Sequence, residues 1–101
     1  MPVMIDNAEN TVTARITGEI DHHNAAELRG GIDLAIKLHQ PEKIILDFGG
    51  VTFMDSSGIG LVMGRHKAAA SYGGKLTVTN TSPDIKKVMR LAGLERLADI
   101  N

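Results

Sequence analysis

The chain has no cysteine, which excludes disulfide bonds, thiolate chemistry and cysteine-ligated metal sites. It also lacks any apolar run approaching the roughly 18–20 residues that a helix needs to span a bilayer. Residues 1–7 contain neither the basic segment nor the long apolar segment of a signal peptide. These absences lead us to expect a cytoplasmic protein without a membrane partner.

Neither sign of charge is in excess. The 101 residues include 11 lysines and arginines and 12 aspartates and glutamates, for a net charge of −1 with histidine neutral. The basic residues form no cluster, so the sequence provides no electrostatic basis for nucleic-acid binding. The hydrophobic fraction of 43% is typical of a globular protein, and a chain of this length buries about two-thirds of its unfolded surface. We therefore predict one domain over residues 1–101.

The beginning of the chain shows the two-residue period that is typical of half-buried strands. Residues 3–7 predict a first strand, and Asn10 suits a turn because asparagine tolerates positive φ. From Thr11 onward, apolar and polar residues alternate strictly. The apolar positions are Val12, Ala14, Ile16 and Ile20. This pattern predicts a second strand that forms a hairpin with the first.

The apolar period then changes to that of a helix. Asn24 followed by Glu27 resembles a capping box, and Asp21 is an alternative cap. The apolar residues that recur at helical spacing are Leu28, Ile32 and Ala35. The helix ends before Pro41, because proline disfavours helical geometry in the residue that precedes it.

The middle of the sequence is its most informative stretch. Residues 44–48 form a short apolar run with one carboxylate, which predicts a strand buried on both faces, and residues 49–55 predict the turn that follows. Ser56 or Ser57 then opens a helix that extends to Tyr72. Its predicted apolar face consists of Ile59, Val62, Met63, Ala69 and Ala70.

Glycine and proline mark the elements of the last third of the chain. The glycines at 73–74 stop the central helix, and residues 75–80 alternate as a further strand. Ser82, followed by proline, predicts the start of a third helix that ends at Gly93. Its apolar stripe consists of Ile85, Val88, Met89 and Ala92. Residues 94–101 predict no definite element.

The elements come in the order β-β-α-β-α-β-α, which is typical of an α/β protein. Strand–helix–strand units imply parallel neighbours joined by right-handed crossovers. We predict a mixed, mostly parallel sheet of four to five strands with three to four helices. If the strands lie in sequence order, the helices share one face of the sheet. The polar side of the second strand then faces water or a partner.

Two adjacent hydroxyl groups lie where the central strand gives way to its helix. The first backbone N–H groups of a helix have no partner within the helix. A hydroxyl or a phosphate placed there meets aligned donors and the positive end of the helix dipole. From spacing alone, Ser56 and Ser57 could also be simple helix caps, and Ser56 is the better cap candidate.

Two motifs resemble those of a known family. They are Gly-Glu-Ile-Asp-His-His at residues 18–23 and Val-Thr-Phe-Met-Asp-Ser-Ser-Gly-Ile-Gly at residues 51–60. With both motifs in order, and over nearly its whole length, the sequence resembles a single STAS domain. It is most similar to the anti-sigma factor antagonists of the bacterial sporulation sigma-F switch. One departure from the family pattern is the short tail after Leu94.

The resemblance implies a function. In that family the unphosphorylated antagonist binds an anti-sigma factor, which is also a serine kinase, and thereby frees the sigma factor. The kinase inactivates the antagonist by phosphorylating the second serine of the Asp-Ser-Ser-Gly element, here Ser57, and a serine phosphatase removes the phosphate. ATP or ADP is expected on the kinase, and no cofactor or metal on this non-enzymatic chain. The residues expected to contact the partner are Asp21, His22, Asp55, Ser56, Ser57 and Gly58.

A phosphate on Ser57 would act mainly through its charge. It adds about −1.5 to −2 charges and three acceptor oxygens. At a helix start it can be held by N–H groups, so the domain need not unfold. Its expected neighbours Asp21 and Asp55 are acidic, and the sequence supplies no obvious cation. A partner surface that fits a neutral hydroxyl would therefore lose affinity through repulsion and desolvation.

Other functions fit parts of the sequence. The domain could serve another switch, such as a general stress response. A hydrolase with a serine nucleophile and His22 or His23 as base is disfavoured, because no Gly-x-Ser-x-Gly elbow is present. The glycines at 58–64 resemble a dinucleotide-binding loop, but the third glycine comes one position late. We expect Gly60 and Gly64 instead to let the helix pack closely on the sheet.

Overall fold

Up to Leu91 the strands and helices follow the predicted order β-β-α-β-α-β-α. The computed structural model describes residues 3–101, so Met1 and Pro2 of the predicted domain lie outside the described residues. The strands are β1 (Val3–Ala8), β2 (Thr11–Ile20), β3 (Lys43–Met54), β4 (Lys75–Thr79) and β5 (Asp99–Ile100). The helices are α1 (Ala25–His39), α2 (Ser56–Ala70) and α3 (Pro83–Leu91), with a short 3-10 helix η1 (Leu94–Arg96). None of the described helices is long and apolar enough to cross a bilayer.

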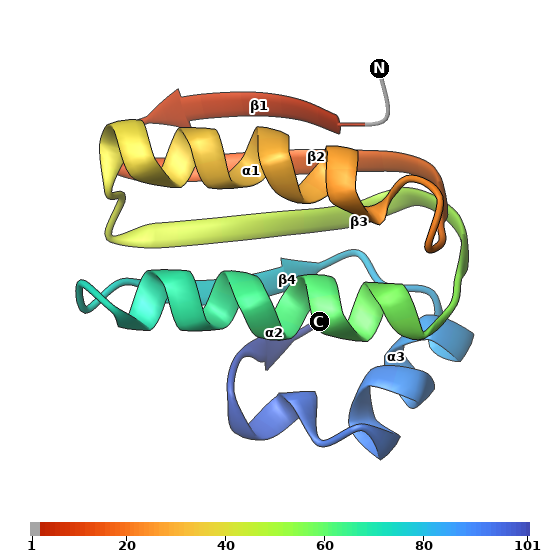
Figure 1. Ribbon diagram of the computed structural model, residues 1–101. Coiled ribbons are helices and arrows are strands. Elements are labelled where there is room, and N and C mark those ends of the chain that lie inside the picture. Colours follow the sequence, from red (N-terminus) through yellow and green to blue (C-terminus); the bar gives the residue numbers. More distant parts are fainter. Residues whose placement is uncertain (1–2) are drawn as a thin grey trace.

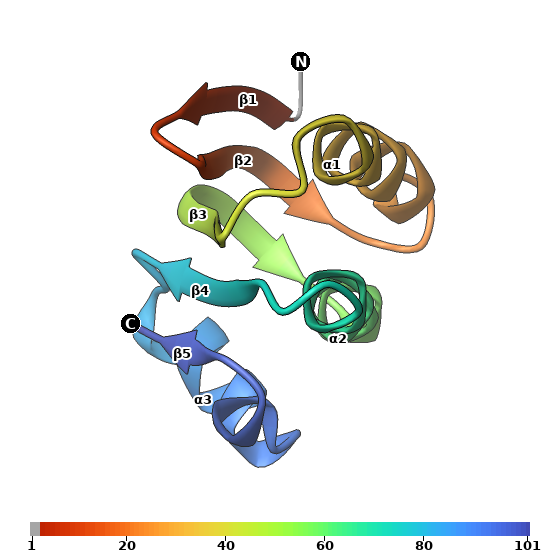
Figure 2. The ribbon, with the colours of Figure 1, turned by 90° about the vertical axis from the view of Figure 1, so that its left-hand side faces the viewer.

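The five strands form one sheet in the order β1-β2-β3-β4-β5 (Figure 1). β1 is antiparallel to β2, and every later pair of neighbours is parallel. Because the strands lie in sequence order, the crossovers all turn the same way, and α1 and α2 cover the same face of the sheet (Figure 2). The predicted mixed, mostly parallel sheet is confirmed.

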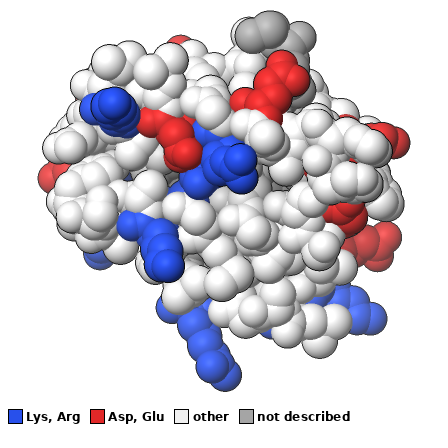
Figure 3. All heavy atoms as spheres, viewed as in Figure 1, with Lys and Arg blue, Asp and Glu red and all other residues white. Residues whose placement is uncertain are grey.

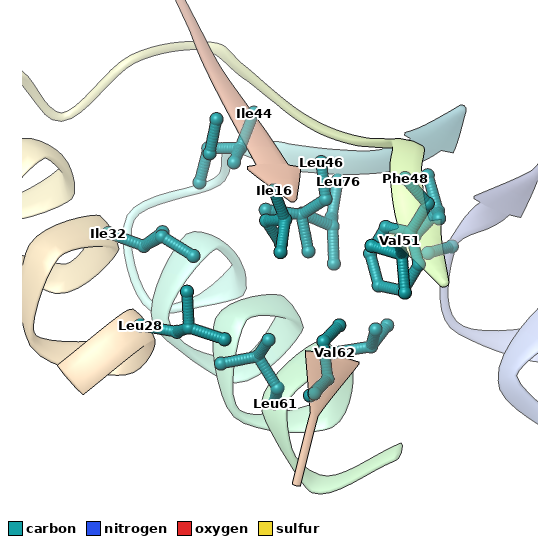
Figure 4. Packing of buried hydrophobic residues seen from close by; sticks show 14 of the residues in the cluster. Ile16, Leu28, Ile32, Ile44, Leu46, Phe48, Val51, Leu61, Val62 and Leu76 are labelled. Atoms are coloured by element: carbon teal, nitrogen blue, oxygen red, sulfur yellow. The ribbon is translucent and has the colours of Figure 1, made fainter. Parts of the chain in front are cut away.

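The hydrophobic core lies between the sheet and these helices. α1 contributes Leu28 and Ile32, and α2 contributes Leu61 and Val62, all of which point into a common interior (Figure 4). The labelled strand residues that face them are Ile16, Ile44, Leu46, Phe48, Val51 and Leu76. At about 25 cal/mol per Å² of apolar surface removed from water, this contact is the main favourable term in folding. The predicted apolar stripe of α1 is confirmed.

The opposite face of the sheet is left open by α1 and α2. Alternate side chains of β3 are buried against the helices, whereas Ile45 and Asp47, which point the other way, are only half-buried. The prediction that this strand is buried on both faces is therefore wrong, because the two helices cover one side. The predicted polar side of β2 does lie on the open face, where Arg15 pairs with Asp6 of β1 at 3.2 Å.

β3 extends further than predicted, because residues 49–54 continue the strand instead of forming a turn. Its pairing with β2 shifts register next to Thr17. At this shift the two backbones come close: a Cβ atom added at Gly50 would lie only 2.7 Å from the methyl carbon of Thr17. Glycine therefore permits the irregular pairing, and the strand continues to Met54.

The face that α2 presents to the core matches the predicted one only in part. Its buried residues are Gly58, Leu61, Val62, Arg65 and Ala69. Val62 and Ala69 of the predicted core face are buried, and the half-buried Ile59 packs against the core. Met63 and Ala70 are exposed, so their prediction as core residues is wrong. Apolar residues occur on several sides of this helix, while the buried row contains an arginine. The hydrophobic period alone therefore could not identify the side that meets the sheet.

Gly58, and not Gly60 or Gly64, provides the close packing at the start of α2. A Cβ atom at Gly60 or Gly64 would meet no heavy atom within 4 Å outside the helix, so the predicted role of these two glycines is wrong. A Cβ atom at Gly58 would lie 2.2 Å from Cγ of Met54, the last residue of β3. The helix therefore begins directly against the end of the strand. It ends at Ala70, earlier than predicted.

The last residues complete both the core and the sheet. Ser82 caps α3 as predicted, and its side chain accepts a hydrogen bond from the Ile85 N–H group at 3.3 Å. Ile85 and Met89 are buried, but Val88 and Ala92 of the predicted stripe are exposed, so that part of the prediction is wrong. Residues 94–101, for which the sequence predicts no element, form η1 and β5, and β5 pairs with β4 in parallel.

Leu61 and Met63 test which side of α2 is buried, because they are 4% and 47% exposed. Leu61→Ala should lower the free energy of unfolding by about 2–5 kcal/mol, since it leaves a cavity in the core. Met63→Ala is the matched control on the same helix and should change this free energy by no more than about 0.5 kcal/mol. Urea denaturation measures both values. Equal losses in the two variants would show that the buried side is misplaced.

Candidate functional site

The two sequence motifs meet at the carboxyl ends of β2 and β3. Asp21 follows the last residue of β2, and Asp55 follows the last residue of β3. Because these strands are parallel neighbours, both loops emerge at the same edge of the sheet (Figure 1). The Asp55 N–H group donates a hydrogen bond to the Ile20 carbonyl oxygen at 3.1 Å, which ties the two loops together. The tertiary structure thus places the predicted site residues side by side.

Asp55, and not Ser56, caps α2. Its backbone is extended, with φ −97° and ψ −168°, and its carboxylate accepts a hydrogen bond from the Ser57 N–H group at 2.8 Å. Ser56 is the exposed first residue of the helix, so its predicted role as the better cap is wrong. An ionised acceptor at the positive end of a helix forms a stronger bond than a neutral hydroxyl, which favours the aspartate. Ser57 is half-buried in the first turn.

The hydrogen bond from the Ser57 N–H group is the main reason why the pKa of Asp55 lies below its ordinary value of 3.8. Desolvation opposes this effect, whereas the Ser57 hydroxyl and His22 favour the ionised form further. Asp55 is therefore a carboxylate at neutral pH.

Asp21 and Asn24 hold the loop before α1 through reciprocal hydrogen bonds. The Asp21 carboxylate accepts from the backbone N–H groups of His23 and Asn24 at 2.9 and 3.1 Å. The Asn24 side chain accepts from the Asp21 N–H group at 3.0 Å and donates to the Glu19 carbonyl oxygen. Because its side chain is already engaged, Asn24 occupies the N-cap position without capping, and the predicted capping box with Glu27 is wrong.

His22 belongs to this loop, and its side chain lies beside the cap of α2. Its Nδ1 atom is 3.8 Å from Oδ2 of Asp55, and its exposed ring lies next to that of His23, with 4.1 Å between the ring centroids. Among residues 3–101, no group of three or more side chains is arranged to hold a metal ion. The imidazole is therefore positioned to contact a ligand or a partner at the helix start.

A hollow of about 430 Å³ lies beside Ser57, between α1 and α2. Its lining residues are His22, Ala25, Ala26, Arg29, Ser57, Gly60 and Leu61. Arg29 is a cation near Ser57 that the sequence pattern does not indicate. The helical period of α1 locates Arg29 one turn beyond Ala25, but only the packing of α1 beside α2 brings it to Ser57.

Phe53 is a second residue of this region that the sequence pattern does not indicate. It is 51% exposed and pairs with Glu19 of β2, next to the Asp21 loop. An exposed aromatic side chain beside charged groups is typical of a protein-binding surface. The two-residue alternation of β3 would have placed it on the surface, had the strand been predicted to reach residue 54.

Five of the six residues predicted to contact a partner lie at the surface of this edge, fully or partly exposed. They are Asp21, His22, Asp55, Ser56 and Ser57. The sixth, Gly58, is buried beneath them against Met54. The partner contacts of all six stay predictions. We refer to the five surface residues together as the switch surface.

The chain is similar to known proteins over nearly its whole length. It matches the family model of the STAS domain over residues 3–101. It is 31% identical over 100 residues to the anti-sigma F factor antagonist of Paenibacillus polymyxa, a match that covers 99% of this chain and 86% of that protein. It is 40% identical over 84 residues to the anti-sigma F factor antagonist of Lysinibacillus sphaericus, covering 83% of this chain and 72% of that protein.

Solved structures of the anti-sigma factor antagonist SpoIIAA have the same fold. The unphosphorylated form superposes with a TM-score of 0.84 at 34% identity, covering 98% of this chain and 87% of that one. The phosphorylated form, from Bacillus, superposes with a TM-score of 0.77 at 34% identity, covering 98% of this chain and 90% of that one. The fold of that relative therefore exists in both phosphorylation states.

The low pKa of Asp55 predicts a pH-dependent contribution to stability. A carboxyl group whose pKa is lower in the folded state stabilises the fold above its unfolded pKa and loses this effect as the pH falls through the folded value. Asp55→Asn should therefore lower the melting temperature at neutral pH, and the difference from wild type should shrink as the pH falls below 3.8. Thermal unfolding across this range measures the difference. A gap that stays constant in acid would contradict the role of the ionised cap.

Proposed function

The chain belongs to the STAS domain family and is an anti-sigma factor antagonist, and we propose that it acts through the switch surface. In the unphosphorylated form, this surface binds an anti-sigma factor, and the sigma factor held by that protein is released. Phosphorylation of Ser57 abolishes the binding. The antagonist is thus a regulatory interaction module and not an enzyme.

The position of Ser57 is the observation that carries this proposal. It lies in the first turn of α2, next to the Asp55 carboxylate, and it lines the hollow that His22 also lines. Ser56 does not line this hollow. A modification of Ser57 therefore changes the charge between the two loops of the switch surface, where a partner that contacts both loops would meet it.

The partner in this proposal is an anti-sigma factor that is also a serine kinase and holds ATP or ADP itself. A serine phosphatase removes the phosphate and restores binding. These partners act in the cytoplasm, where sigma factors direct transcription. The chain's net charge of −1 and its lack of a basic cluster support a protein partner over nucleic acid.

Phosphorylation acts through local charge. The phosphate adds about −1.5 to −2 charges beside Asp55, which is already ionised. The start of α2 tolerates an anion, which helix dipoles stabilise there by roughly 0.3–1 kcal/mol. A partner surface that packs against a neutral hydroxyl must instead desolvate the phosphate without compensation, which costs more. The domain therefore keeps its fold and loses its partner.

We further propose that the partner belongs to a sporulation sigma-F switch, as the names of the two bacterial relatives suggest. The alternative is an equivalent module in a general stress response. Binding of the purified chain to an anti-sigma F factor and to an anti-sigma factor of a stress response, measured side by side, distinguishes the two. Tighter binding to the second would reassign the switch and leave the antagonist function in place.

Ser57 and Ser56 provide a matched pair for the phosphorylation site. Incubation with the kinase and ATP should add one phosphate to wild type and to Ser56→Ala, and none to Ser57→Ala, as read by intact mass. Ser57→Ala should still bind the anti-sigma factor, because the contact surface accepts a small neutral group. Stoichiometric phosphorylation of Ser57→Ala would overturn the assignment.

Asp21 can be tested separately as a contact residue and as a loop-forming residue. Asp21→Asn retains an oxygen that can accept from the His23 and Asn24 N–H groups, so the loop and the melting temperature should change little. Without the charge, affinity for the anti-sigma factor should fall about tenfold, or about 1.4 kcal/mol, in calorimetry. Normal binding by Asp21→Asn together with weak binding by Asp21→Ala would show that Asp21 acts only through the loop.

A further inference from the structure

The hollow beside Ser57 contains the cation that a phosphate on this residue would need. Arg29 of α1 and Ser57 of α2 both line it, together with His22. We propose that Arg29, assisted by His22, is an intramolecular receptor that binds the phosphate of Ser57 within the same domain. The inference rests on the proposed phosphorylation of Ser57 and says where the phosphate goes once it is attached.

The charge of Arg29 is not neutralised within the described chain. Asp33 lies one turn further along α1, the usual distance for an ion pair on a helix. However, Oδ1 of Asp33 lies 2.9 Å from Nε of Arg65 on α2, close enough for an ion pair although not aligned as a hydrogen bond. Because Arg65 engages this carboxylate from the neighbouring helix, no ion pair of Arg29 is found among residues 3–101.

The two arginines and Asp33 form a small cluster with an excess of one positive charge. Burial is the main cause of a lowered pKa for Arg65; the Asp33 carboxylate opposes it, and the charge of Arg29 adds to it. Arg29 is thus close enough to Arg65 to repel it. Basic and acidic groups are seen side by side over α1 and α2 on this face of the molecule (Figure 3). A phosphate beside Arg29 would offset the excess charge.

The surroundings of Ser57 direct a phosphate toward Arg29. The Asp55 carboxylate, which accepts the Ser57 N–H hydrogen bond, would repel the phosphate from the side of the helix cap. On the other side, the small residues Ala25, Ala26 and Gly60 leave the hollow of about 430 Å³ open. A guanidinium group can bind two phosphate oxygens at once, which makes arginine the preferred partner for such a group.

This arrangement adds a second component to the switch. A phosphate bound by Arg29 occupies the hollow between the two helices, so a partner side chain that enters the hollow is excluded by volume as well as by charge. It also ties the start of α2 to α1. An aspartate at position 57 carries less charge and is shorter, so it would reproduce this state only in part.

The test uses full-length protein with phosphoserine incorporated at position 57 during translation, so that no kinase is required. Phosphorus NMR follows the second ionisation of the phosphate with pH, in wild type, Arg29→Gln and Lys37→Gln. A nearby guanidinium favours the dianion, so the ionisation midpoint should lie about half a pH unit or more lower in wild type than in Arg29→Gln. Lys37→Gln, which removes one charge further along α1, should match wild type.

Two further variants sharpen the result. Arg29→Lys should restore part of the shift, and a His22→Gln background separates the contribution of the guanidinium from that of the imidazole. Equal midpoints in wild type and Arg29→Gln, with both folded by thermal unfolding, would overturn the proposal. If the midpoints differ but the kinase modifies another residue, the receptor stands and the proposed phosphorylation site fails.

Discussion

The parallel pairing of β2 with β3 is the constraint on which the functional surface depends. The Asp21 loop and the start of α2 each begin where one of these strands ends, and the hydrogen bond from Asp55 N–H to the Ile20 carbonyl joins them at 3.1 Å. The irregular register beside Gly50 lets β3 continue to Met54 despite the bulge. Without that extension the cap of α2 would not lie next to the Asp21 loop. A property of the sheet therefore determines the geometry of the switch surface.

The start of α2 combines features that suit a reversible charge switch. Gly58 packs directly against Met54, so the helix position is defined by core contacts and not by the serines themselves. The capping hydrogen bond runs from the Ser57 backbone N–H group to Asp55, so the cap does not depend on the Ser57 hydroxyl alone. A modified Ser57 can therefore change what the surface presents while the fold stays intact. The solved structures of the relative SpoIIAA in both phosphorylation states agree with a fold that tolerates the modification.

The ion pair between Arg65 and Asp33 links packing to this surface. Arg65 is only 6% exposed and reaches from α2 to the carboxylate on α1. The Asp33 side chain is 44% exposed. Such an ion pair adds little net stability, because desolvation of the buried arginine offsets much of the attraction. The ion pair matters more for Arg29, because Arg65 engages the Asp33 carboxylate with which Arg29 would otherwise pair. An interaction within the helix layer thus leaves a cation beside Ser57.

The sequence by itself determined the order of the elements up to α3, the inward residues of α1 and the motif that contains Ser57, because alternation, helical period and turn residues are local signals. The one-sided helix layer depended on the strand order, which only the structure shows. It misplaced part of the buried side of α2, where apolar residues surround the helix and the buried row includes Arg65. It also missed Arg29, because two helices far apart in sequence must pack together before an arginine on one can face a serine on the other. Only the tertiary structure decided which of the residues that local patterns point to became neighbours in space.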